Sequence, residues 1–218
     1  MELEIQGISW RFHPSGAVYW PETKSLLLAD LHLGKESVFQ QSGLAIPSGA
    51  TNTTLRALRS LVHAWKPDRV IVLGDLLHAI TGLTATLEQE LVVLLAEGIC
   101  PEWILIPGNH DRGAMRALRR CGWQIADELM QYHGVELTHA PDSARTNSSM
   151  SITGHLHPSI RIPLSVREKT LLRCFWLNAS RLILPAFGGW TGTKPISPAK
   201  GDRIFACADD EVIELVNW

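Results

Sequence analysis

Five short segments of this chain carry side chains that bind divalent metal ions. In chain order they are Asp30-Leu31-His32, Gly74-Asp75, Gly108-Asn109-His110-Asp111, Thr138-His139 and Gly154-His155-Leu156-His157. Each segment follows or ends an apolar run with the length of a strand, and strand ends that meet at one edge of a sheet commonly build a site. Two Asp, one Asn and four His suit a pair of divalent ions. The pattern indicates metal-assisted hydrolysis of a phosphate ester, with one further His left for acid–base work.

Residue spacing supports the metal interpretation of these segments. In extended backbone, residues two apart point to the same side, so Asp30 and His32 can address one ion, as can His155 and His157. Asp75 follows a predicted buried strand, and its carboxylate can bridge two cations, which makes it the natural shared ligand. Single residues have alternative interpretations, because a capped turn explains Asp30 and a helix N-cap explains Asp75.

The segment that begins at residue 108 is more specific. A Pro-Gly pair predicts a sharp turn, after which an amide, an imidazole and a carboxylate follow in succession. A turn with an Asx cap explains Asn109 or Asp111, but it does not explain His110 beside them. His139 has no second candidate ligand beside it in the sequence. Taken by itself, it is more simply interpreted as a hydrogen-bonded polar residue at a strand end.

The residues between these segments predict the elements that must position them. Leucines with a helical period predict helices, and continuous apolar runs predict buried strands. The expected strands are Ala17–Trp20, Ser25–Ala29, Arg69–Leu73 and Trp103–Ile106, and the expected helices are Thr51–Trp65 and Thr86–Ala96. Their alternating order predicts a mainly parallel sheet with right-handed crossovers.

The chain after Gly122 differs, because short strand candidates are joined by turns. The expected strands are Val135–Thr138, Ser151–Thr153, Arg161–Ile162, Leu171–Leu177, Arg181–Leu184, Ile204–Ala206 and Val212–Val216. Metal-ligand candidates lie in both halves, and no polar linker separates the halves. We therefore expect an α/β fold with two sheets in a single domain over residues 1–218.

Composition narrows the class of protein. The net charge of −2 gives no global attraction to nucleic acid or anionic membranes, so polyanion binding must come from a local patch or bound metal. Four widely spaced cysteines, and a first segment without signal-peptide character, predict a cytoplasmic protein. No apolar run reaches the ~18 residues that span a bilayer. The motifs H-E-x-x-H, G-x-S-x-G and G-K-[ST] are absent, which argues against zincin, serine-hydrolase and ATP-driven chemistry.

The order of the five segments resembles the signature of the calcineurin-like metallophosphoesterases over residues 26–158. The resemblance implies a four-layer α-β-β-α sandwich with two metal ions at a sheet edge. It implies one ion bound by Asp30, His32, Asp75 and His157, and a second bound by Asp75, Asn109, His139 and His155. The family often has glycine where this chain has Thr138, so the loop shape there is expected to differ although the ligand is kept.

A narrower resemblance is to the bacterial DNA-ligase-associated metallophosphoesterases. It rests on total length and on four segments, Ala29–Lys35, Gly74–His78, Gly154–Pro158 and Leu184–Gly192. It implies a phosphodiesterase or nuclease that acts on DNA in repair, with a DNA ligase or a helicase as a partner. It favours Mn²⁺ as the metal, and the mixed nitrogen and oxygen ligands also suit Fe²⁺ or Zn²⁺.

The expected reaction is attack on phosphorus by a hydroxide held between the two ions. His110 is the expected general acid, which protonates the departing alkoxide. Two alternatives stay open: the substrate is a nucleotide or another small phosphate ester, or the chain is a non-catalytic scaffold of the same fold. The scaffold alternative is disfavoured because all seven ligand positions and His110 are filled.

Four further residues are candidates for substrate contact. They are Lys35, Arg112, Arg116 and Trp190. Helical spacing puts the two arginines on one face with two more, where they are expected to follow a phosphate backbone, and the tryptophan is expected to stack on a base. The alternatives are a solvated arginine face, a lysine without a role, and an aromatic side chain that pins its loop to the core.

Overall fold

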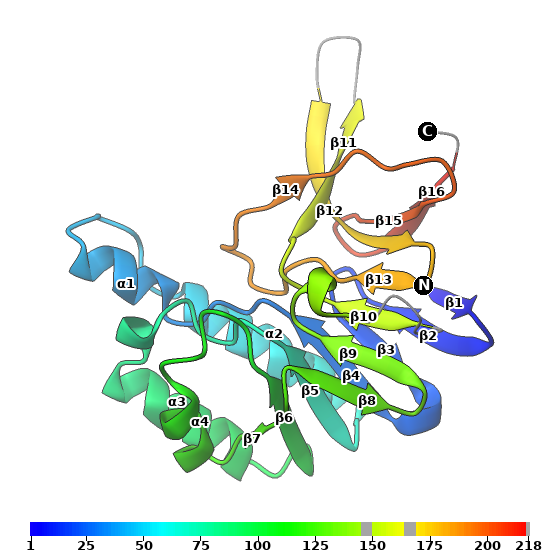
Figure 1. The fold of residues 1–218 in the computed structure, drawn as a ribbon. Helices are drawn as coiled ribbons and strands as arrows, with labels where there is room; N and C mark the ends of the chain where they lie inside the picture. The colour runs from blue at the N-terminus through cyan, green and yellow to red at the C-terminus, as the bar shows by residue number, and fades with distance from the viewer. Residues whose placement is uncertain (145–149, 164–168, 217–218) are drawn as a thin grey trace.

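Two β-sheets lie against each other in this protein, and helices cover the outer face of one of them (Figure 1). The computed structural model describes residues 1–144, 150–163 and 169–216. Within these residues the first sheet has seven strands and the second sheet has nine. The predicted α/β fold with two sheets is confirmed.

The first sheet contains the strands of the predicted alternating pattern. Across the sheet, in chain order, they are β1 (Glu2–Ile5), β2 (Ile8–Phe12), β3 (Val18–Trp20), β4 (Ser25–Ala29), β5 (Arg69–Leu73), β6 (Glu102–Ile106) and β7 (Gln124–Ile125). Neighbours from β1 to β4 pair antiparallel, and neighbours from β4 to β7 pair parallel. The carboxyl ends of β4, β5 and β6 therefore lie side by side at one edge.

Helices connect the strands of the described residues. The α-helices are α1 (Lys35–Gln41), α2 (Ala50–Trp65), α3 (Ala85–Ala96) and α4 (Met115–Arg120), and the 3-10 helices are η1 (Pro21–Thr23), η2 (Ile80–Gly82) and η3 (Pro141–Ser143). Helices α2 and α3 each begin one residue before the predicted start and end where predicted. The sequence does not predict α1, because Glu36 is its one buried residue and it has no apolar period. Among the described residues, no helix is both long and apolar enough to span a bilayer.

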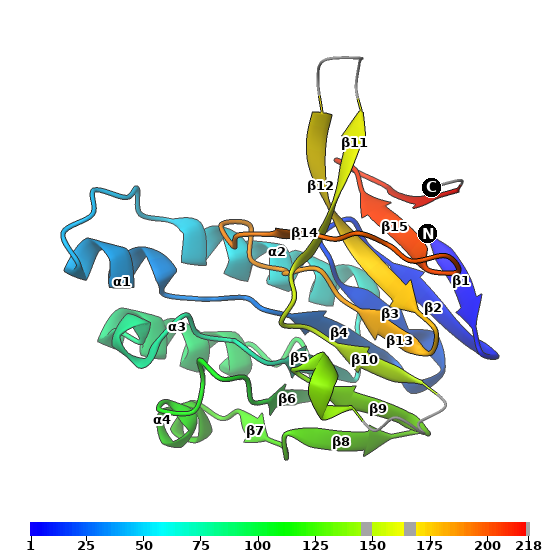
Figure 2. The same cartoon turned by 45° about the horizontal axis from the view of Figure 1, so that its top comes forward.

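The second sheet contains all seven strands that the sequence predicts for the second half. Its order is β14 (Lys194–Pro195), β11 (Pro158–Pro163), β12 (Lys169–Asn178), β13 (Arg181–Ile183), β10 (Ser151–Thr153), β9 (Val135–Thr138) and β8 (Leu129–Tyr132), with β15 (Arg203–Cys207) beside β12 and β16 (Val212–Leu215) beside β15. Strands β11 and β12 are longer than predicted, and together they project beyond the rest of the sheet (Figure 2).

The core has separate layers because side chains alternate along each strand. On β4, Leu26 and Leu28 face the helices, whereas Leu27 and Ala29 face the second sheet. A smaller cluster lies on the other face of the second sheet, formed by Ile160, Cys174, Ile204 and Ala206. The α-helices of the described residues lie on the side of the first sheet (Figures 1 and 2), so the layer order in this part of the chain is α-β-β. The second helical layer of the expected four-layer α-β-β-α sandwich is not present among these residues.

The substitution Phe175→Ala tests the packing between the two sheets. The ring of Phe175 is fully buried and stacks on Phe12 at a centroid distance of 4.5 Å, so Phe175→Ala leaves a cavity in the core. We expect the free energy of unfolding to fall by about 3–5 kcal/mol, measured by urea denaturation. Leu171→Ala, at an exposed position of the same strand, is the control and should change this free energy by less than about 0.5 kcal/mol. A loss below about 1 kcal/mol for Phe175→Ala would contradict the packing.

Candidate metal centre

Metal-ligand candidates from both sheets meet at one edge. Each of them lies close behind the end of a strand: the first sheet carries Asp30, His32, Asp75 and Asn109, and the second sheet carries His139, His155 and His157. A hydrogen bond joins the two sets, because the main-chain N–H of His155 donates to Asp30 Oδ2 at 2.8 Å. The structure therefore brings together all seven candidates that the sequence predicts.

The backbone at five of these residues is left-handed. The angle φ is 55° at Asp30, 47° at His32, 45° at Asp75, 69° at His155 and 46° at His157. Residues with a Cβ rarely adopt this conformation, and they cluster at active sites and ligand clamps. The strained backbone is an indication of function that is independent of residue type.

Two glycines of the motifs are required by close approach within this edge. A Cβ at Gly108 would lie 2.1 Å from Asp75 Oδ1, and a Cβ at Gly74 would lie 2.1 Å from His139 Nδ1. Gly74 also has a φ of 73°. These positions must be glycine so that a carboxylate and an imidazole from other segments reach the centre.

One group of donor atoms gathers around Asp30. His157 Nε2 lies 3.5 Å from Asp30 Oδ2 and 3.4 Å from His32 Nε2. His32 Nε2 lies 3.9 Å from Asp75 Oδ2. Ligand atoms that bind one ion at ~2.0–2.2 Å are about 3–3.5 Å apart, so these separations are close to those of a single ion site.

A second group of donor atoms gathers around His139. Its Nε2 lies 3.4 Å from Asp75 Oδ2, 3.2 Å from Asn109 Oδ1 and 3.0 Å from His155 Nδ1. Asp75 Oδ2 belongs to both groups, as a shared ligand requires. The subsets Asp30, His32, His157 and Asp75, His139, His155 each bring their ligand atoms within 4.8 Å of one another.

The hydrogen bonds around the two groups fit bound cations. His139 Nδ1 donates to the main-chain carbonyl of Leu73 at 3.1 Å, and His157 Nδ1 donates to that of Gly192 at 2.9 Å. A carbonyl only accepts, so Nδ1 of each ring carries a proton, and in the neutral ring Nε2 is the unprotonated nitrogen that faces the centre. Asp30 Oδ1 is buried and has no hydrogen-bond partner among the described residues. Its other oxygen, Oδ2, lies 3.5 Å from His157 Nε2, and a buried carboxylate oxygen beside an imidazole lone pair is a suitable site for a cation.

The surroundings of Asp75 and His32 keep these two ligands in their metal-binding forms. Burial raises the pKa of Asp75, but the hydrogen bond and charge of His139 and the main-chain N–H of His110 outweigh it and lower this pKa to about 2. Burial, together with neighbouring imidazoles, lowers the pKa of His32 to about 3 against the charge of Asp75. Asp75 is therefore ionised and His32 is neutral, as metal ligands must be. At His139 and His157 burial lowers the pKa, but the facing carboxylates outweigh burial and raise it.

His110 lies beside the two groups without joining either. Its Nδ1 donates to the main-chain carbonyl of His78, so its Nε2 is the nitrogen that faces the centre, 4.0 Å from Asp75 Oδ2. Its main-chain N–H donates to Asp75 Oδ1 at 3.1 Å. The side chain is half-buried and is therefore open to a substrate on one side.

Asp111, the last residue of the same motif, is a structural tie. Its carboxylate is fully buried and accepts main-chain N–H groups from Leu77 at 3.0 Å, Gly108 at 3.0 Å and Leu76 at 3.3 Å. Burial outweighs these bonds and raises the pKa of Asp111 to about 6. Asp111 therefore holds the loop after β5, which carries Asp75, against the loop after β6, in which Asp111 itself lies.

Two of the predicted substrate contacts, Lys35 and Trp190, lie beside the centre. Lys35 Nζ donates to the main-chain carbonyl of Trp190 at 3.0 Å, and both residues line a small recess with His32. Trp190 is 54% exposed, so it does not pin its loop to the core. The loop is held instead by its backbone, because Gly188 N donates to Asp30 O at 3.2 Å.

The two arginines among the predicted contacts are on the surface. Arg112 forms an ion pair with Glu128 at 3.3 Å, and both side chains are well exposed. It also precedes α4, so of the two predicted contacts only Arg116 lies on the helix that the sequence predicts. Arg116 is exposed.

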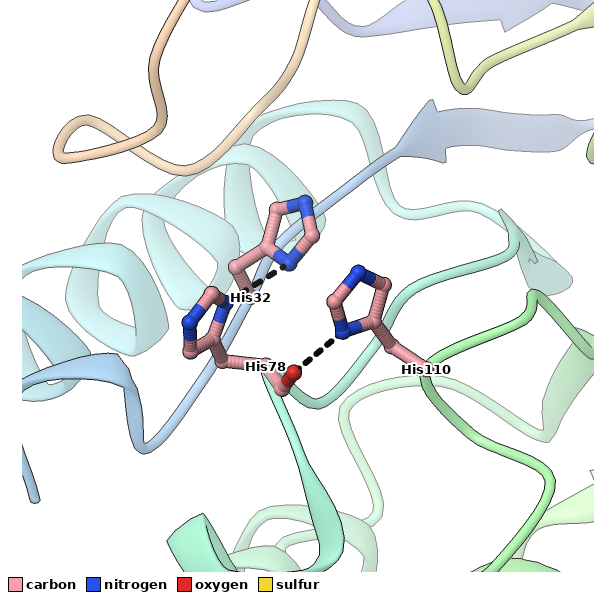
Figure 3. Close-up of side chains that lie close together, drawn as sticks. All are labelled: His32, His78 and His110. Atoms are coloured by element: carbon pink, nitrogen blue, oxygen red, sulfur yellow. Dashed lines mark hydrogen bonds between the residues drawn. The ribbon is translucent and has the colours of Figure 1, made fainter. Parts of the chain in front are cut away.

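His78 is close to the centre but lies outside the predicted ligand set. Its ring stacks on His110, with centroids 5.4 Å apart and planes 19° apart, and its Nδ1 lies 3.5 Å from His32 Nδ1 (Figure 3). Its only signal in the sequence is its place three residues after Asp75.

Comparisons with known proteins agree with this geometry. The model of the calcineurin-like phosphoesterase family matches residues 23–159. The crystal structure of Pseudomonas putida nuclease MPE is 28% identical, with 99% of each chain covered and a TM-score of 0.81. A protein of unknown function from Aquifex aeolicus is 17% identical over 61% of this chain and 78% of that chain, and its TM-score of 0.41 is too low for a common fold to be inferred. Curated proteins give no match.

The matched residues make up more than half of the chain and include all seven ligand candidates. Members of this family carry a centre of two divalent ions, and the donor groups around Asp30 and His139 fit such a centre. The chain therefore belongs to the calcineurin-like phosphoesterase family and is a metal-dependent phosphoester hydrolase.

Proposed function

We propose that this enzyme is a phosphodiesterase that cleaves nucleic acid, with DNA repair as its role. Two observations support this substrate class. A solved structure that matches 99% of this chain is that of a nuclease. An open groove of about 680 Å³, lined in part by Arg56, Arg59 and Trp190, lies beside the recess at the metal centre. A DNA ligase or helicase partner and a cytoplasmic location stay predictions.

Seven residues hold the two ions in this proposal. The observation that carries it is the position of Asp75 Oδ2, which lies within 3.9 Å of His32 Nε2 in one donor group and 3.4 Å of His139 Nε2 in the other. Four imidazoles and an amide oxygen favour borderline ions over Ca²⁺ or Mg²⁺. We infer Mn²⁺, with Fe²⁺ and Zn²⁺ as the alternatives.

When bound, two such ions acidify a water molecule and neutralise phosphate charge. The protein supplies the remaining proton through His110, whose Nδ1 is held by the carbonyl of His78 while Nε2 is free to give a proton to the departing oxygen. The hydrogen bond from His110 N to Asp75 Oδ1 keeps this acid at a fixed place relative to the shared carboxylate.

Substrate contacts follow from what lies around the centre. Lys35 is beside His32 and meets a phosphate oxygen next to the scissile bond. Trp190 offers an exposed ring for stacking on a base. Arg112 and Arg116 are exposed and attract the phosphate backbone through their charge.

A substrate panel tests the proposed ester class. In the presence of Mn²⁺ we expect cleavage of DNA and bis-p-nitrophenyl phosphate, weaker turnover of p-nitrophenyl phosphate, and no turnover in EDTA. Fluorescence of labelled oligonucleotides and p-nitrophenol release provide the measurements. Cleavage of small esters alone, without DNA binding at low salt, would replace the nucleic acid by a nucleotide or another small phosphate ester as the substrate.

Asp75→Ala tests the shared ligand. Because this carboxylate belongs to both donor groups, its removal should abolish the binding of both ions and reduce activity by more than ~10³-fold. Metal content is measured by mass spectrometry after dialysis against Mn²⁺. Asp127→Ala, at an exposed position, is the matched control. A folded Asp75→Ala protein that keeps two ions would refute the assignment.

His110→Ala tests the general acid. The variant should keep both ions, because His110 belongs to neither donor group, and should cleave DNA about 10²–10⁴-fold more slowly. The loss should be smaller for bis-p-nitrophenyl phosphate, since nitrophenolate leaves without a proton. His63→Ala, on the exposed face of α2, is the control. Equal losses on the two substrates would argue against proton transfer by His110.

A further inference from the structure

His32 differs from two other histidines of the centre in the partner of its outer nitrogen. The outer nitrogens of His139 and His157 donate to main-chain carbonyls. The outer nitrogen of His32, Nδ1, faces Nδ1 of His78 at 3.5 Å (Figure 3). Two imidazole nitrogens that face each other require one donor and one acceptor.

The tautomers of both rings follow from this contact. His32 Nε2 points into the donor group, 3.4 Å from His157 Nε2 and 3.9 Å from Asp75 Oδ2. To bind an ion through Nε2, His32 must carry its proton on Nδ1. His78 must then accept that proton's hydrogen bond at Nδ1 and carry its own proton on Nε2.

The same residue supports the general acid. The ring of His78 stacks on His110, and its main-chain carbonyl accepts the hydrogen bond from His110 Nδ1 (Figure 3). His78 is itself held in place. Its main-chain N–H donates to Leu33 O at 3.0 Å, and its ring packs against that of Phe39 with the ring centroids 5.6 Å apart. A single side chain thus contacts a metal-ligand candidate on one side and the candidate acid on the other.

We propose that His78 is a positioning residue that fixes His32 as a metal ligand through its ring nitrogen and fixes His110 as the general acid through its ring face. The proposal rests on the proposed function of the centre. It separates two effects of one residue, since the nitrogen acts on metal affinity and the ring face acts on turnover.

A different use of the same cluster is an ion site of its own, because ligand atoms of His32, His78 and His110 lie within 4.8 Å of one another. The hydrogen bonds argue against it. Nδ1 of His110 is already engaged by a carbonyl. His32 would have to bind one ion through each nitrogen, which an imidazole with one proton does not do.

The tautomers are measured on the wild-type protein loaded with Zn²⁺, which is diamagnetic. Long-range ¹H–¹⁵N correlation spectra distinguish Nδ1–H from Nε2–H rings. We expect Nδ1–H at His32 and Nε2–H at His78. A proton on Nδ1 of His78, or none on Nδ1 of His32, would overturn the proposal. This measurement needs neither a variant nor a substrate.

Two variants of His78 separate its functions. His78→Phe keeps an aromatic face and removes the acceptor, so we expect the Kd for Mn²⁺ to rise ~10–100-fold in calorimetry. Its kcat at saturating Mn²⁺ should change by less than about threefold. His78→Asn keeps an acceptor near Nδ1 and removes the ring, so Kd should stay within about threefold while kcat on DNA falls ~10–100-fold with little change in KM.

His63→Phe and His63→Asn, at an exposed position, are the matched controls and should change neither quantity. Equal effects of the two His78 variants on Kd and on kcat would assign His78 a general structural role and overturn the proposal. A third equivalent of Mn²⁺ that is lost in His78→Phe would overturn it in favour of an ion site. If the wild type cleaves no phosphodiester, the proposed function fails, whereas the tautomers and the Kd for Mn²⁺ still decide the role of His78.

Discussion

The candidate site depends on a left-handed backbone at residues that are not glycine. Each such residue costs on the order of 1–3 kcal/mol, so the surrounding structure has to hold it in place. The β4–β5 ladder does this by continuing past the strand ends, where Asp30 N donates to Gly74 O at 3.2 Å and His32 N donates to Asp75 O at 2.9 Å. From the second sheet, His155 N donates to Asp30 Oδ2 at 2.8 Å. The hydrogen bonds that maintain the strained backbone therefore also set the positions of the donor atoms.

Neither sheet carries a complete set of donor atoms. The carboxylates and Asn109 come from the first sheet, whereas three of the four imidazoles come from the second, so the distances between them depend on how the sheets pack. The shared core reaches almost to the site. Ala29, the residue before Asp30, is buried between the sheets, and its carbonyl accepts the N–H of Phe187 at 2.8 Å. A shift of one sheet relative to the other would therefore change both the apolar packing and the distances between the donor atoms.

The elements and ligands that the sequence predicts are those with a local pattern. Ser25–Ala29 and Arg69–Leu73 are buried on both faces, and such strands appear as continuous apolar runs. Strands β1 and β2 have no such run, because exposed and half-buried residues alternate with few buried ones. The set of candidate ligands follows from residue types and their order. The contacts of His78 cannot be seen in the sequence, because three segments distant in the sequence create them. The exposure of Trp190 cannot be seen either, because it depends on backbone hydrogen bonds of its loop.

Two buried carboxylates show why residue type alone does not give the role. Asp75 and Asp111 both follow a glycine-containing turn after a strand, yet their pKa values move in opposite directions, to about 2 and about 6. Imidazoles surround Asp75, so its charge is stabilised beside both groups of donor atoms. Main-chain N–H groups surround Asp111, and burial dominates. A carboxylate that joins two loops uses its oxygens to accept main-chain N–H groups, whereas a shared ligand needs an oxygen that faces both donor groups, as Asp75 Oδ2 does. The neighbours of each carboxylate, which the fold supplies, decide which of the two it becomes.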